Sequence, residues 1–135
     1  MYKNGILHSE LARWIATLGH HNYLLITDAG FPYLRGIPHI ELGFTPGKPS
    51  FVEVLQSISE ALVIEKVWFA SEFPEQNPHV YQQFVSIVPE QVAQVIGDHE
   101  QFKKKVSEAL VVVRTGEFTP YANCLIECGA SFFRS

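Results

Sequence analysis

Residues 19–30, GHHNYLLITDAG, contain the segment that decides the fold. Residues 23–27 within it carry no charge and consist of aromatic, leucine and β-branched side chains, with polar residues on either side. Such a run is typical of a buried strand in an α/β sheet. Ligands of open α/β sheets bind beyond the carboxyl ends of the strands. The DAG that follows this run is therefore a candidate site.

Strands and helices are predicted in alternation along the rest of the chain. Apolar residues at helical spacing follow Ser9 and end at a glycine, a second helix begins at Ser50, and residues 77–88 predict a third. A capping box opened by Asp98 predicts a fourth helix that begins at His99. Short apolar runs predict further strands at 63–70, 92–96, 110–114 and 123–129. This alternation indicates a three-layer α/β/α sandwich with a mostly parallel central sheet.

The composition is that of one globular domain spanning residues 1–135. Hydrophobic residues make up 47% and charged residues 18%, which argues against disorder. The net charge of −4 provides no basic footprint for nucleic acid or an anionic membrane. No apolar stretch approaches the ~20 residues of a membrane span, and the N-terminal residues lack the apolar run of a signal peptide. We therefore expect a cytoplasmic protein with neither a nucleic-acid nor a membrane partner.

Two cysteines, Cys124 and Cys128, fall within the last predicted strand. Four residues apart on one face of a strand, they would lie about 13 Å from each other. A disulfide requires Cα atoms within about 7 Å. We therefore predict two buried, reduced thiols, as expected in a reducing compartment.

Titratable residues stand at both ends of the central strand. His20 follows the glycine expected to end the first helix, and Asp28 follows the strand itself. The neighbouring pair His20 and His21 raises the question of a metal site, but adjacent side chains diverge in a helix or a strand. No HxH or HxxxH spacing supplies further ligands, and the Walker, GxGxxG and GxSxG motifs are missing from the sequence. We therefore expect no metal and no cofactor.

Two further groups of polar residues are candidates for a site. His99 and Lys103 lie one turn apart, so they share a face of the predicted helix. Tyr121 and Asn123 flank Ala122, so their side chains lie on one side if this segment is extended. Each residue also has an ordinary structural interpretation, such as a solvated helix face or a packed aromatic. Spacing alone does not say whether these residues converge.

Six motifs follow one another in a fixed order over nearly the whole chain: LGH at 18–20, TDAGFP at 27–32, PSFVEVL at 49–55, NP at 77–78, HEQFK at 99–103 and TGEFTPYANCLI at 115–126. In these motifs the sequence resembles the D-ribose pyranase/fucose mutarotase family. Its DAG.P and TGE.TPYAN patterns are closer to the ribose branch. In residues 33–48 it departs from the usual ribose-branch pattern.

The resemblance implies a cofactor-independent isomerase that interconverts the pyranose and furanose forms of D-ribose. It gives His20 the acid/base role, and it implies sugar-binding positions at Asp28, His99, Lys103, Tyr121, Ala122 and Asn123. It also implies pentameric rings stacked as a homodecamer, with the pocket between adjacent subunits. The apolar Phe132 and Phe133 near the end of the chain are candidates for burial in such contacts.

Three other functions remain open from the sequence. A mutarotase for fucose or another deoxy sugar would need an apolar wall for a methyl group, which Phe31, Tyr33 or Phe44 could provide. A sugar-binding accessory protein of a transport system would use the same pocket without turnover. A metal-dependent hydrolase that uses the histidines is the least favoured alternative.

Overall fold

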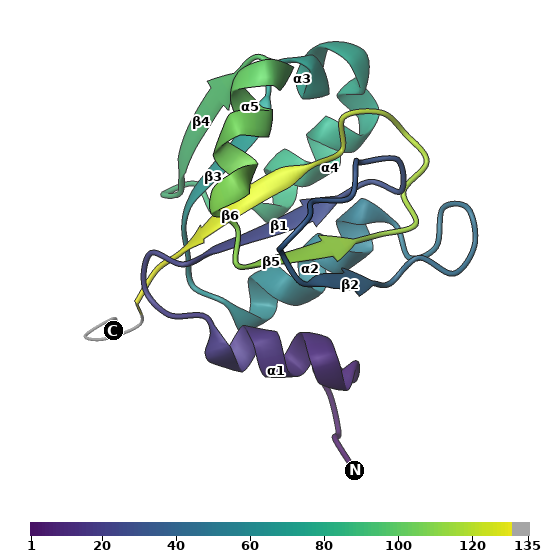
Figure 1. The fold of residues 1–135 in the computed structure, drawn as a ribbon, viewed down its shortest axis with the longest axis vertical. Helices are drawn as coiled ribbons and strands as arrows, with labels where there is room; N and C mark the ends of the chain where they lie inside the picture. Colours follow the sequence, from purple (N-terminus) through teal and green to yellow (C-terminus); the bar gives the residue numbers. More distant parts are fainter. Residues whose placement is uncertain (131–135) are drawn as a thin grey trace.

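Six strands form one mixed sheet in the computed structural model, which describes residues 1–130 (Figure 1). The strands lie in the order β2-β5-β1-β6-β3-β4. Only β6 runs antiparallel to its neighbours, so the other described strands share one direction. Their bounds are β1 (Tyr23–Thr27), β2 (His39–Glu41), β3 (Ile64–Ala70), β4 (Ala93–Gly97), β5 (Val111–Arg114) and β6 (Cys124–Cys128). Phe132 and Phe133 lie outside the described residues.

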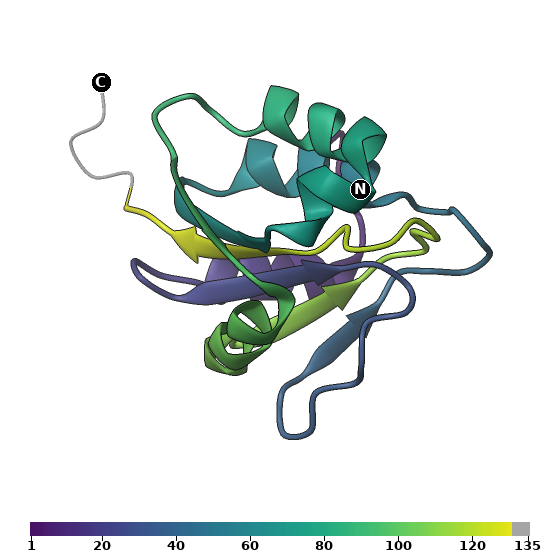
Figure 2. The same cartoon turned by 90° about the horizontal axis from the view of Figure 1, so that it is seen from above.

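Helices cover both faces of this sheet (Figure 2). The helices are α1 (Ser9–Thr17), α2 (Phe51–Ala61), α3 (Glu72–Gln76), α4 (Pro78–Ile87) and α5 (His99–Lys105), followed by a 3-10 turn, η1 (Val106–Glu108). The larger core packs α1, α2, α3 and α4 against one face, and the smaller core packs α5 and η1 against the other. The predicted three-layer architecture with a mostly parallel sheet is therefore confirmed. No helix within residues 1–130 has the length and apolar character that a membrane crossing requires.

The larger core is built around four phenylalanines. Phe51, Phe69, Phe73 and Phe84 are fully buried, and their ring centroids lie 5.3–6.2 Å apart in the contacting pairs. Edge-to-face and tilted pairs at these distances stabilise a core beyond simple burial of apolar area. This packing fixes α2, α3 and α4 on the sheet. It thereby holds the amino ends of α2 and α4 next to the loop after β5.

Most helix ends lie where the sequence predicts them. The capping boxes at Ser50 and Asp98 are both present. The predicted cap at Ser9 is wrong, because Nδ1 of His8 accepts the backbone N–H of Leu11 at 3.2 Å and Ser9 is the first helical residue. The helix also ends at Thr17, two residues before the glycine that was expected to end it. Two elements, β2 and α3, lie in segments that the sequence analysis left without regular structure.

The two cysteines are buried and free, as predicted. Burial raises the pKa of the Cys128 thiol to about 11, and it raises the pKa of Cys124 still further. Because the thiolate is the reactive form, we expect neither cysteine to react with an aromatic disulfide reagent at pH 8 in the native protein. Both should react in urea. Rapid labelling of either cysteine without denaturant would contradict this burial.

Candidate active site

A cavity of about 550 Å³ opens at the carboxyl end of β1. Its walls are residues 28–32, which follow β1, residues 117–121, which follow β5, and the side chains of His99 and Asn123. Parallel strands β1 and β5 end side by side, and the loops that leave them form the two main walls. The cavity therefore lies at the edge of the sheet where the sequence predicts a ligand site.

Asp28 and Asn123 line the cavity and are hydrogen-bonded to each other. The backbone N–H of Asp28 donates to Oδ1 of Asn123 at 2.8 Å, and Oδ1 of Asp28 accepts the backbone N–H of Gly30 at 3.0 Å. Burial raises the pKa of the Asp28 carboxyl, although hydrogen bonds from Gly30 and Asn123 oppose that rise. The site therefore holds a carboxyl group and an amide in fixed positions, nearly shielded from solvent.

Glu117, whose role the sequence does not reveal, holds the opposite wall of the cavity in place. Its Oε1 accepts the backbone N–H of Phe51 at 3.0 Å, and its Oε2 accepts the hydroxyl of Thr119 at 2.7 Å. Asn77 donates to the same hydroxyl at 2.8 Å and to the carbonyl of Pro120 at 2.9 Å. These bonds tie the loop to the amino ends of α2 and α4. The only sequence signal was one charged residue within the turn TGEFTPY.

Tyr121 adopts a backbone conformation that the sequence analysis did not predict. Its φ of 60° places it in the left-handed region, and its carbonyl accepts the N–H of Asn123 at 2.9 Å. The expected extended segment is therefore a tight turn. Tyr121 and Asn123 nevertheless both line the cavity, while Ala122 is fully buried in the core. Such strained residues cluster at functional sites.

His99 completes the group that the structure brings together. It is the first residue of α5, and its ring meets that of Tyr121 edge to face with centroids 5.3 Å apart. Its Nδ1 is shielded from solvent and has no hydrogen-bond partner among the described residues. Lys103, one turn further along α5, is exposed and is not part of the cavity lining.

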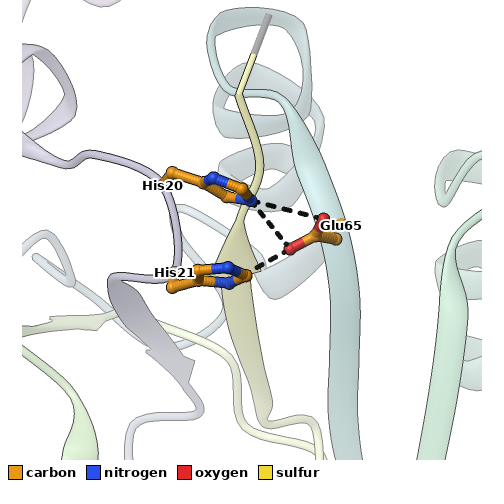
Figure 3. Close-up of side chains that lie close together, drawn as sticks. All are labelled: His20, His21 and Glu65. Atoms are coloured by element: carbon orange, nitrogen blue, oxygen red, sulfur yellow. Dashed lines mark hydrogen bonds and ion pairs between the residues drawn. The ribbon is translucent and has the colours of Figure 1, made fainter.

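His20 lies at the opposite end of β1 from the cavity. It precedes the strand while Asp28 follows it, and a strand of five residues spans roughly 16 Å. The His20 ring instead approaches Glu65 of β3, with Nε2 3.4 Å from Oε2 (Figure 3). His20 and Asp28 therefore belong to two separate clusters within one chain.

The side chains of His20 and His21 lie parallel, so the prediction that they diverge is wrong. His21 has a φ of 69°, and the two imidazole rings stack with their centroids 3.8 Å apart (Figure 3). The segment is neither helix nor strand but a turn. The backbone N–H of His21 donates to the carbonyl of Cys128 at 2.8 Å and holds this turn in place. A left-handed residue reverses the usual divergence of neighbouring side chains.

Comparison with known proteins gives a consistent relationship over the whole chain. Residues 1–131 match the RbsD / FucU transport protein family. A D-ribose pyranase of Bacillus licheniformis is 43% identical over 132 residues, which cover 98% of this chain and 100% of that protein. The D-ribose pyranase of Bacillus subtilis (strain 168) is 39% identical with the same coverage.

Two solved structures share the fold. The structure of Bacillus subtilis RbsD complexed with D-ribose matches with a TM-score of 0.92 and 38% identity, covering 98% of this chain and 100% of that one. The fucose mutarotase of Streptococcus pneumoniae in complex with L-fucose matches with a TM-score of 0.77 and 18% identity, covering 96% and 99%. At 18% identity, the similarity to the second structure indicates a shared fold and nothing about function.

Proposed function

Because this chain belongs to the RbsD / FucU transport protein family, we propose that it is a D-ribose pyranase, an isomerase that interconverts the pyranose and furanose forms of D-ribose. One observation carries the proposal. The cavity after β1 gathers a carboxyl, an amide, a phenol and an imidazole in a chain that aligns end to end with D-ribose pyranases. Buried thiols without a disulfide are in keeping with the cytoplasmic location expected from the sequence.

The reaction needs only proton transfers. A base takes the proton of the anomeric hydroxyl while an acid gives a proton to the ring oxygen, and the C–O bond of the hemiacetal breaks. The open-chain aldehyde rotates, and a different hydroxyl adds to the carbonyl carbon to close a ring of the other size. Histidine suits both directions because its unperturbed pKa lies near neutrality.

The cavity supplies the groups that hold a polyhydroxy ligand. Asp28 and Asn123 offer acceptors and donors side by side, and the Tyr121 hydroxyl can do both. His99 lines the same cavity, and an imidazole can donate or accept a hydrogen bond with a sugar hydroxyl. Ala122 would contribute through its backbone, since its side chain is buried. Lys103 would reach the sugar only from the rim.

His20 is proposed to act on a sugar bound by a second copy of the chain. Its position at the far end of β1 supports this, because no side chain could bridge that distance within one copy. An interface that joins the His20 end of one copy to the cavity end of the next is head to tail, and such an interface forms a ring when the rotation between copies closes. The geometry thus supports a ring, whereas the pentamers stacked as a homodecamer come from the family resemblance. Phe118, which lines the cavity and is 70% exposed, is a candidate for burial there.

We expect the protein to accelerate exchange between ribopyranose and ribofuranose, and to do so equally well in EDTA. Saturation-transfer NMR on ribose with catalytic amounts of protein measures this exchange directly. A metal requirement would appear as loss of exchange in EDTA and recovery with a divalent ion. Ribose binding with exchange no faster than in buffer would instead identify a sugar-binding accessory protein.

The same experiment on L-fucose separates the two branches of the family. Of the aromatic residues considered for a methyl-binding wall, Phe31 lines the cavity, whereas Tyr33 and Phe44 are exposed and are not part of its lining. Of these three residues, Phe31 is therefore the one placed to contact a sugar methyl group. Because the chain aligns end to end with D-ribose pyranases, we expect faster exchange for ribose than for fucose.

A further inference from the structure

The turn before β1 and strand β3, which lies on the far side of β6 in the sheet, bring three potential metal ligands together. One ligand atom from each of His20, His21 and Glu65 lies within 4.8 Å of the others (Figure 3). We infer that this cluster binds a zinc ion, and that zinc inhibits the isomerase by occupying His20. The inhibition rests on the role proposed for His20 above, whereas the binding site stands on its own geometry.

The distances fit the coordination of zinc. Nε2 of His20 lies 3.4 Å from both oxygens of Glu65, and Nδ1 of His21 lies 3.3 Å from Oε2. Neighbouring donors on a tetrahedral zinc ion, each roughly 2.1 Å from the metal, lie about 3.4 Å apart. Charge-assisted hydrogen bonds are shorter, at roughly 2.8 Å. The spacing of these atoms therefore matches ligands around an ion better than a tight imidazole–carboxylate pair.

Oε2 of Glu65 is shielded from solvent, and its neighbours in the cluster are the imidazoles of His20 and His21, at 3.4 and 3.3 Å. Neither contact has the geometry of a hydrogen bond to this oxygen. Burying a carboxylate oxygen is costly unless its charge is compensated. A cation between this oxygen and the two imidazoles would compensate that charge directly. Two imidazoles with one glutamate are also a known ligand set for zinc in proteins.

Glu127 adds negative charge beside the cluster. Its Oε2 lies 3.0 Å from Nδ1 of His21, and its Oε1 accepts the Tyr23 hydroxyl at 3.1 Å. On coordination, zinc would take the place of any proton on Nδ1, and that proton would leave to solvent.

The backbone holds the two imidazoles ready for an ion. His21 adopts the left-handed region, which only a few per cent of residues other than glycine adopt, histidine more often than most. The N–H of Gly19 donates to Oδ1 of Asn22 at 2.7 Å, which closes the turn from its other side. A backbone held in this way loses little freedom when an ion binds. Strained residues of this kind cluster at ligand sites.

Zinc bound here would compete with catalysis. Coordination uses the lone pair of His20 Nε2, so the histidine can no longer take a proton from the sugar. The reaction itself would need no metal, and EDTA would therefore not abolish it. The site would instead make activity fall when free zinc rises.

Calorimetric titration of zinc chloride into the full-length, metal-free protein tests the site without any activity measurement. We expect one zinc per chain, and we expect His21→Asn and Glu65→Gln each to weaken zinc binding at least about tenfold. Asparagine is chosen at position 21 because it tolerates the left-handed conformation. His79→Asn, at an exposed histidine of α4, is the matched control and should bind zinc like the unaltered protein. Magnesium chloride should not bind, because Mg²⁺ prefers oxygen ligands.

The ribose exchange assay then tests the inhibition. Zinc should lower exchange by the unaltered protein at least about tenfold, EDTA should restore it, and zinc should leave unchanged whatever exchange His21→Asn retains. Zinc affinity unchanged in His21→Asn, or no zinc binding at all, would overturn the inference while leaving the proposed function intact. Zinc binding by a protein that shows no exchange even in EDTA would leave the site intact and contradict the proposed function.

Discussion

Replacing His20 with alanine should lower the turnover of ribose exchange by about 10²–10⁴-fold, the usual contribution of a positioned acid/base group. Ribose affinity should change little, because the sugar is held by the cavity at the other end of β1. Exchange NMR gives the turnover, and calorimetry with ribose gives the affinity. His79→Ala provides a control for loss of an exposed histidine. Full turnover in His20→Ala would contradict the assignment and make His99 the better candidate for the proton carrier.

Replacing Asn123 with alanine should weaken ribose binding by roughly 1–3 kcal/mol, the cost of leaving a buried polar group without its partner. The change removes a ligand contact and also the acceptor for the backbone N–H of Asp28 at 2.8 Å. Calorimetry measures the loss of affinity, and a thermal melt checks that the variant remains folded.

Lys103→Ala provides the comparison for this second variant. Lys103 is exposed and lies outside the cavity lining, so its removal should cost less affinity than the loss of Asn123. Equal affinities for ribose in Asn123→Ala and the unaltered protein would mean that the sugar binds elsewhere.

The sequence predicts the architecture well because the core strands and helices are marked by local patterns. The apolar runs at β1, β3 and β5, and the capping boxes at Ser50 and Asp98, need no information from distant residues. The edge of the sheet that holds the cavity follows from the direction of the parallel strands. β2 is different, because its three residues form a strand only by pairing with β5.

The details of the site depend on tertiary contacts that periodicity does not encode. Positive φ values at His21 and Tyr121 decide where these side chains point, and the pattern of apolar and polar residues does not predict them. Glu117 holds its loop in place by accepting a hydrogen bond from the amino end of α2, which is far from it in the sequence. Helical or strand spacing therefore identifies the candidates near the cavity but not the pairing of His20 with Glu65.

A mixing experiment tests most directly whether His20 of one copy serves the cavity of another. At ribose concentrations well below saturation, His20→Ala is expected to be nearly inactive and Asn123→Ala strongly impaired as pure assemblies. The two variants are mixed in equal amounts, unfolded and refolded together, so that the rings assemble at random. About one interface in four should then combine an intact His20 with an intact cavity and regain activity, if the interface is head to tail. Native mass spectrometry confirms that the assemblies are mixed. Mixed assemblies with no more activity than the separate variants would contradict the account.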